Sequence, residues 1–181
     1  MKKRWLLTLI LTCLLFIPSL VFAVDFDVLS YQGDLNIHAD NTAIFKETIT
    51  YRFGDDYNGQ LVGLGKAGKM PKGFAIDPDP TVQVSKNGKI VQNISYYTME
   101  EEDGYKVKIY NAGYAGDTVR VTVIWKLSNL LFLYKDIAEL NWQPLTDSTG
   151  DIKEIEFKVS SDHPAEKLYF HAAQLLRHSS V

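Results

Sequence analysis

Between residues 26 and 159 the sequence alternates apolar and polar residues with a period of two. In the clearest stretch, DTVRVTVIWKLSN at residues 117–129, one side of an extended chain would carry Val119, Val121, Val123 and Trp125. Successive side chains of a β-strand point to opposite faces, and β-branched and aromatic residues favour strands. This stretch therefore predicts a strand whose valines and Trp125 face an apolar core.

Other stretches repeat the alternation and end in turn residues. Strands are predicted at residues 26–38 and 42–53, joined by a turn at Asp40-Asn41, and another is predicted near residues 152–159. In the strand at 42–53 neither face is purely apolar. We therefore expect this strand to be covered in part on both sides.

Two short motifs predict hairpins. Asn87-Gly88 lies between apolar alternations and fits a type I′ turn, in which both central residues need a positive φ. Asp103-Gly104 repeats the arrangement. Consecutive hairpins indicate a meander, and the close spacing of short strands predicts an all-β fold, an antiparallel β-sandwich.

Two stretches depart from this pattern. Residues 54–80 are rich in Gly, Pro and charge, and they predict a long surface connection. Near the C-terminus, helical spacing predicts a possible short amphipathic helix that would carry Leu168, Ala172, Leu175 and Leu176 on one side.

Residues 1–23 have the three parts of a secretory signal peptide: a basic start at residues 2–4, a long apolar helical run, and small residues at the cleavage position. Cleavage after Ala23 would leave residues 24–181 as one extracellular domain. The alternative is an uncleaved membrane anchor, because the apolar run is nearly long enough to span a bilayer.

Cysteine content and charge limit the possible classes of protein. Cys13 is the only cysteine and lies in the signal, so the exported chain has no disulfide and depends on its core for stability. Of the 19 Lys and Arg, three lie in the signal, which leaves 16 against 22 Asp and Glu and a net charge of −6. A phosphate backbone calls for a basic face, so we expect no nucleic-acid partner.

Asp136 and Glu139 lie inside the apolar stretch YKDIAELNWQ and are the first candidates for chemistry. Paired-carboxylate catalysis needs two acids at a controlled separation, but residues three apart on a strand point to opposite sides. We therefore favour structural roles. Asp136 would bond backbone amides near the start of a strand, and Glu139 would meet a basic residue on a neighbouring strand.

No other motif carries a catalytic or metal signature. The serines lack a nucleophile elbow, and GLGKAG at residues 63–68 matches no phosphate-binding loop. The short spacing of a zinc site is missing from the four histidines, His38, His163, His171 and His178. We expect neither a metal nor a cofactor.

Aromatic residues make up 12% of the chain and leave two interpretations open. Tyrosines stabilise ordinary sheets through cross-strand pairs, but a flat patch of exposed rings would instead indicate a surface for sugars or peptides. The residues concerned are Tyr57, Tyr96, Tyr97, Tyr105, Tyr110, Tyr114, Trp125, Trp142 and Tyr169.

The order of these features resembles a known family. After the signal come FDVLSYQGDLNIHADNTAIFKETITYRFGDDYNGQ, a Gly-rich loop and YAGDTVRVTVIWKLSNLLFLYKDIAELNWQPL. The motif YNG at residues 57–59 and the pattern Y.D.AEL.W at residues 134–142 are similar to those of predicted bacterial membrane proteins grouped as domain of unknown function 2207, in their N-terminal extracellular region. The resemblance covers nearly all of the exported chain.

The resemblance implies an outward-facing β domain followed by transmembrane helices and a Gly-rich tail. Because no hydrophobic segment follows the signal, we expect a chain truncated at its C-terminus. No biochemical activity attaches to the family, so no catalytic residue is carried over. The residues expected to serve structure are Asp136, Glu139, Trp142, Trp125 and Gly59.

These observations favour a non-enzymatic, exported domain of a cell-envelope protein that acts in interaction or sensing. It would meet the membrane through the signal segment or through the transmembrane region expected in full-length relatives. The alternative is a secreted carbohydrate-active protein that binds or hydrolyses a cell-wall glycan. An enzyme of that kind needs a cleft with two convergent acids, whereas an interaction domain needs only a surface patch.

Overall fold

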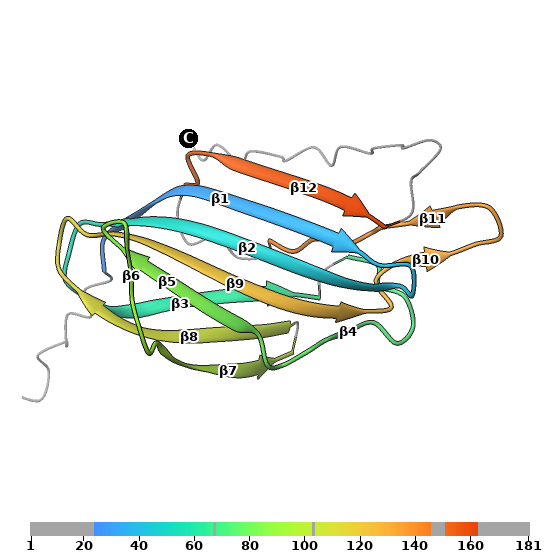
Figure 1. Cartoon of the computed structure of the whole chain (residues 1–181), viewed down its shortest axis with the longest axis horizontal. Coiled ribbons are helices and arrows are strands. Elements are labelled where there is room, and N and C mark those ends of the chain that lie inside the picture. Colours follow the sequence, from blue (N-terminus) through green and yellow to red (C-terminus); the bar gives the residue numbers. More distant parts are fainter. Residues whose placement is uncertain (1–23, 67, 103, 146–150, 163–181) are drawn as a thin grey trace, which may run out of the picture.

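The computed structural model describes residues 24–66, 68–102, 104–145 and 151–162 of the chain. Its regular structure is entirely β (Figure 1), with twelve strands among these residues. Within this described part there is no helix that could cross a membrane. The predicted all-β class is confirmed. The predicted signal helix and the possible C-terminal helix lie outside the described residues.

The larger of two facing sheets has seven strands in the order β12-β1-β2-β9-β5-β6, and β4 also pairs with β9. Its strands are β1 (Phe26–Ile37), β2 (Thr42–Phe53), β4 (Ala75–Ile76), β5 (Thr81–Lys86), β6 (Lys89–Ile90), β9 (Thr118–Ser128) and β12 (Ile155–Ser161). The pairs are antiparallel except at the edge, where β12 runs parallel to β1. Figure 1 shows β12 beside β1 at this edge. The predicted antiparallel arrangement is therefore correct except for β12.

The second sheet is narrower. It contains β3 (Tyr57–Gly65), β8 (Gly104–Gly113) and β7 (Ser95–Glu101) in that order, with antiparallel pairing. A separate hairpin of β10 (Phe132–Leu133) and β11 (Ala138–Glu139) projects from one end of the domain (Figure 1).

The core between the sheets is formed by the apolar residues that alternate with polar ones along the strands. Val119, Val121, Val123 and Trp125 of β9 are at most 1% exposed, as predicted. From the opposite sheet, β3 and β8 supply Val62, Leu64, Val107 and Ile109, which are equally buried and belong to the same cluster. The core of a cysteine-free domain thus lies between β2, β9 and the three-stranded sheet.

Residues 54–80, predicted as a surface connection, contain the nine-residue strand β3. Gln60, Val62 and Leu64 alternate along this strand and are buried. The outer face of β3 includes glycines such as Gly63, which have no side chain. The alternation of apolar and polar residues that usually indicates a strand is therefore absent from the sequence. The prediction of a surface connection was wrong for β3, because glycines at alternate positions interrupt the apolar and polar pattern of period two.

Both predicted hairpins are present. Asn87 and Gly88 connect β5 to β6 with φ values of 51° and 78°, as a type I′ turn requires. Glu101 pairs with Gly104 where β7 leads into β8. Gly104 is thus the first residue of β8 and not a turn residue, so the Asp103-Gly104 motif predicted the hairpin but placed its turn one residue too late. The two hairpins belong to different sheets. They therefore do not form the continuous meander that was predicted from these two motifs.

Replacing Gly59 by Ala should destabilise the domain, because the added Cβ would collide with the carbonyl oxygen of Ile109 on the paired strand β8. We expect a loss of at least about 1 kcal/mol in the free energy of unfolding, measured by urea denaturation. Gly63→Ala is the matched control on the same strand, because its Cβ would lie 3.5 Å from Lys106 Cγ, an ordinary contact. Equal stability of the two variants would contradict the close approach.

Candidate functional site

Asp136 and Glu139 lie on the projecting β10–β11 hairpin. Its turn is closed by Tyr134 N–H donating to the carbonyl of Ile137 at 2.9 Å, and Glu139 pairs with Phe132 in β10. Both carboxylates are exposed, and neither makes a hydrogen bond or ion pair with another described residue. They therefore lack the burial that paired acids need for catalysis, and the partners expected for them are not observed. Their structural role stays a prediction.

Trp142 packs beside the main core at the end of the same segment. Its ring meets Phe45 of β2 edge-on, with centroids 5.0 Å apart, and its Nε1 donates to the carbonyl of Gly65 at 3.0 Å. The half-buried Trp142 thereby joins the last residue of β3 to the larger sheet. The structural role expected for Trp142 stays a prediction.

Glu47 of β2 is the one acid among the described residues that is buried in the centre of the sandwich. Its side chain is fully buried, and its Oε1 accepts a 2.7 Å hydrogen bond from Trp125 Nε1, while Oε2 accepts a 3.3 Å bond from the hydroxyl of Tyr31. β1, β2 and β9 are adjacent strands, which places the three side chains together. Trp125 is thus both a core residue and the main donor to a buried carboxyl.

Burial raises the pKa of Glu47 to about 7, although the hydrogen bonds from Trp125 and Tyr31 oppose this shift by favouring the carboxylate. Burial also raises the pKa of Tyr31 and of Tyr51, and the nearby Glu47 charge adds to both effects. Both tyrosines therefore stay neutral, and Tyr31 donates to Glu47. Glu47 is enclosed between the sheets, where Trp125 and Tyr31 contact its carboxyl group.

Sequence reasoning did not single out Glu47. The available signal was one acid on the strand face that also carries Phe45 and Tyr51. Identifying its partner required the pairing of β2 with β9, because Trp125 is 78 residues away in the sequence.

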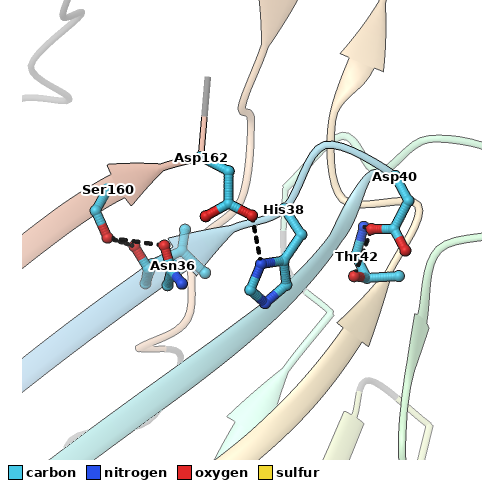
Figure 2. Close-up of polar contacts among 7 residues, drawn as sticks. Asn36, His38, Asp40, Thr42, Ser160 and Asp162 are labelled. Carbon is cyan, nitrogen blue, oxygen red and sulfur yellow. Dashed lines mark hydrogen bonds and ion pairs between the residues drawn. The ribbon is translucent and has the colours of Figure 1, made fainter. Parts of the chain in front are cut away.

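A row of polar pairs joins β1 to β12 on the outer face of the larger sheet. Gln32 Nε2 donates to Glu156 at 3.3 Å, and Asp34 lies opposite Lys158. The next two pairs appear in Figure 2, where Ser160 faces Asn36 and Asp162 faces the ring of His38. Ser160 Oγ donates to Asn36 Oδ1 at 3.1 Å, and His38 Nδ1 lies 2.8 Å from Asp162 Oδ2. Each outer position of this junction therefore has a complementary partner.

Ser160, His38 and Asp162 are residue types of a hydrolytic triad, but their contacts differ from one. The Ser160 hydroxyl donates to Asn36 and to the carbonyl of Leu35, at 3.1 and 3.3 Å, and not to His38. Among the described residues, no group of three or more metal-ligating side chains is present. These side-chain contacts are best explained as stabilising the pairing of β1 with β12, the only parallel strand pair among the described residues.

Two other polar features lie on this outer face. Beside the row is a shallow hollow of about 180 Å³ with mixed charge, and Gln32 bridges Arg120 and Glu156 at its rim. At the β1–β2 turn, hydrogen bonds from the hydroxyl and the amide of Thr42 hold the pKa of Asp40 below its usual range (Figure 2). The contacts of Asp40 stabilise the turn. The hollow is lined by two acids, Asp34 and Glu156, and three basic residues, Lys46, Arg120 and Lys158.

The outer face of the three-stranded sheet is different, because it exposes aromatic and apolar side chains. Leu61, Tyr97 and Tyr110 are 54%, 42% and 49% exposed. Lys108 lies between Leu61 and Tyr97 in the register of the sheet, with its Nζ 5.5 Å from the centre of the Tyr110 ring. The two tyrosine rings are 6.0 Å apart at 35°. We call these four residues the tyrosine face.

The aromatic residues considered in the sequence analysis differ in how far they are exposed. Tyr57 and Trp125 are buried, while Tyr96, Tyr105 and Trp142 are half-buried against the core. Tyr114 is exposed in a turn, and Tyr169 lies outside the described residues. Only Tyr97 and Tyr110 among them form an exposed pair, the patch that the ligand-surface interpretation requires.

Comparison with known families matches this chain to a family model. The model described as the N-terminal domain of a predicted membrane protein (DUF2207) matches residues 27–178, which include every described strand except the first residue of β1. No curated protein matches this chain.

Solved structures give weak likenesses. The M1 zinc metallopeptidase from Deinococcus radiodurans is 17% identical with a TM-score of 0.34, over 57% of this chain and 20% of that chain. Native yeast LTA4 hydrolase is 11% identical with a TM-score of 0.37, over 56% of this chain and 14% of that chain. This chain thus spans a fifth or less of these two proteins, and likenesses at such TM-scores carry no argument.

The stability of the domain should fall as pH rises from about 4.5 to about 7. Unfolded Glu47 loses its proton near its ordinary pKa of 4.5, whereas the folded protein keeps that proton up to about pH 7. In this window Glu47 contributes a slope on the order of 1 kcal/mol per pH unit, which levels off at higher pH. Urea denaturation of the wild type and of Glu47→Gln at several pH values measures this contribution.

Glu47→Gln should remove that part of the slope, because the amide keeps an oxygen for Trp125 but does not titrate. Asp136→Asn, an exposed acid without a described partner, is the control and should follow the wild type. Identical pH profiles for wild type and Glu47→Gln would contradict a shifted buried carboxyl.

Proposed function

This chain belongs to the DUF2207 family of predicted membrane proteins, as its N-terminal domain, and we propose that it is an exported, non-enzymatic interaction module of a cell-envelope protein. The signal-like residues 1–23 support export, and the membrane assignment of the family supports a place at the cell surface. The domain would bind an extracellular polymer while the rest of a full-length relative holds it at the membrane.

The tyrosine face is the observation that carries this proposal. Soluble domains bury most large apolar side chains, and contiguous exposed ones mark interaction sites. Tyr97 and Tyr110 present ring surface with a hydroxyl at the rim, a combination suited to ligands that are apolar on one side and polar on the other. Both lie on adjacent strands, β7 and β8, with ring centres 6.0 Å apart, so a ligand could contact both rings at once.

A cell-wall glycan is the ligand class that this face fits best. Sugar rings have apolar C–H faces that stack on aromatic rings, and hydroxyl rims that hydrogen-bond to groups such as the Tyr97 and Tyr110 hydroxyls. Gly59 lies opposite Tyr110 and Gly63 opposite Lys106, so no large side chain from these two positions of β3 rises beside the rings. An extended chain of sugars could therefore lie along the sheet.

The hydrolytic alternative has less support. Glycoside hydrolysis needs two carboxyl groups on either side of one bond. Asp136 and Glu139 lie apart from the tyrosine face on the projecting hairpin, and Glu47 is enclosed in the core. Glu101, at the end of the strand that carries Tyr97, is paired with Lys106 at 2.7 Å.

Replacing both Tyr97 and Tyr110 by Ala should weaken binding of residues 24–181 to purified peptidoglycan at least about tenfold, because each ring contributes on the order of 1 kcal/mol by stacking. Co-sedimentation with peptidoglycan measures the affinity, and a glycan array identifies the sugars bound.

The matched control replaces two other exposed tyrosines, Tyr114 and Tyr134, which are 74% and 54% exposed outside the tyrosine face. This double variant should bind as the wild type does. Undiminished binding by the Tyr97 and Tyr110 variant would remove the tyrosine face from the proposal. Release of soluble sugars from the peptidoglycan would favour the hydrolytic alternative.

A further inference from the structure

The β10–β11 hairpin exposes apolar side chains where it projects from the domain (Figure 1). Leu133, Tyr134 and Ile137 are 64%, 54% and 63% exposed, and we call these three residues the hairpin tip. A 2.9 Å hydrogen bond from the amide of Tyr134 to the carbonyl of Ile137 closes the turn between them. None of the three is among the described residues that form or border the core. Large apolar side chains exposed this close together mark an interaction site.

The hairpin tip is apolar on both of its faces. Leu133 pairs with Ala138 across the hairpin, and successive residues of a strand point to opposite faces. Leu133 therefore points to one face, whereas Tyr134 and Ile137, which lie one position nearer the turn, point to the other. The surface of a protein partner would cover one of these faces and leave the other in water. The interface of a lipid bilayer surrounds an inserted hairpin on all sides and buries both faces.

The connection from β3 to β4 is held beside this hairpin. Trp142 donates to the carbonyl of Gly65 at 3.0 Å, and Asn129 donates to the carbonyl of Gly73 at 2.9 Å. The connection is therefore fixed near both of its ends to the residues that precede and follow the hairpin.

This connection brings positive charge to the hairpin. Lys69 Nζ lies 5.7 Å from the centre of the Phe132 ring in β10, so a cation lies at the base of the tip. Residues 66–73 and 132–139 together contain four lysines and two acids, a net charge of +2. The exported chain, residues 24–181, carries −6. The hairpin and the connection beside it thus form a positive region of an acidic chain, which suits a bilayer with anionic headgroups.

We propose that the hairpin tip inserts into the surface of a lipid bilayer that contains anionic headgroups. Leu133 and Ile137 enter the apolar layer, and the Tyr134 ring lies at the level of the headgroups with its hydroxyl in water. The lysines of the connection bind lipid phosphates. The family match supports a bilayer as the occupant, because it describes a predicted membrane protein.

This contact orients the domain and does not anchor it. Three side chains bury too little apolar surface for stable attachment on their own. In a relative whose membrane part already holds the domain at the surface, the contact becomes intramolecular and its effective concentration is high. The hairpin tip then determines which end of the domain faces the bilayer. It is separate from the tyrosine face, so this proposal does not depend on glycan binding.

Binding of residues 24–181 to vesicles tests the proposal. This chain contains every described strand and the whole core cluster, and it lacks the apolar residues 1–23, which would bind vesicles themselves. Co-sedimentation with vesicles of phosphatidylcholine and phosphatidylglycerol measures the affinity. Leu133→Ser with Ile137→Ser should weaken binding at least about tenfold, because two aliphatic side chains are no longer buried in lipid. Both positions are exposed, so the strand signal in circular dichroism should not change.

The matched control changes two exposed side chains at the other end of the domain. Ile90 and Tyr114 are 76% and 74% exposed and lie near the start of β9, whereas the hairpin follows its end. Ile90→Ser with Tyr114→Ser should bind vesicles as the wild type does.

A second pair of substitutions tests the headgroup charge. Lys69→Gln with Lys72→Gln should lower the affinity for the vesicles that contain phosphatidylglycerol at least about fivefold. The affinity for pure phosphatidylcholine vesicles should not change, because those vesicles carry no net charge.

A fluorescent label locates the contact on the domain. Residues 24–181 contain no cysteine, so Ile137→Cys and Ile90→Cys each give a chain with a single site for a nitrobenzoxadiazole label. Addition of vesicles should shift the emission of the label at position 137 to shorter wavelength and leave that of the label at position 90 unchanged.

Several results would overturn the proposal. Absence of an emission shift at position 137 does so even if the serine variants do not fold, and so does wild-type affinity of a folded Leu133→Ser, Ile137→Ser variant. An equal loss of affinity in the Ile90→Ser, Tyr114→Ser control would show that the contact is not specific to the hairpin tip. Unchanged affinity of the Lys69→Gln, Lys72→Gln variant would refute the preference for anionic headgroups. A shift at position 137 that needs no vesicles and grows with protein concentration would assign the hairpin tip to a second copy.

Discussion

A sheet of three strands has to cover the inner surface of a sheet of seven, and the rest of the domain depends on this mismatch. Where the sheets overlap, Trp125 and the valines of β9 meet Val107 and Ile109 of β8, and the core is complete without a disulfide. Beyond the overlap, other elements have to take over. The segment that carries Trp142 does so beside Phe45, and β12 is left with its inward side half open.

The alternation of apolar and polar residues predicted the fold class, but it did not predict strands in which glycine interrupts the alternation. The strand at residues 118–128 was evident because Val, Thr and Arg mark its two faces, whereas β3 was missed because glycines occupy part of its outer face. The parallel direction of β12 was not predictable from local pattern, because period two is the same in both directions. Its partner β1 lies more than a hundred residues earlier, and only the assembled sheet determines that pairing.

Sequence reasoning was also only partly successful for the candidate sites. The sequence drew attention to Asp136 and Glu139, which the fold exposes on a hairpin, and passed over Glu47, whose environment exists only when β1, β2 and β9 are side by side. Tyrosine-rich composition allowed both a structural and a ligand-binding interpretation. What distinguishes Tyr97 and Tyr110 from the other rings is strand register, since a shift by one residue would have turned both into the core.

The parallel pairing of β1 and β12 has a mechanical consequence for the domain. Tension between the chain before β1 and the chain after β12 pulls these two strands in opposite directions along their length. Their ladder is then loaded in shear, with all hydrogen bonds and the pairs from Gln32–Glu156 to His38–Asp162 resisting together, whereas an antiparallel edge would peel open one bond at a time. The junction is thus oriented to resist a pull along the chain.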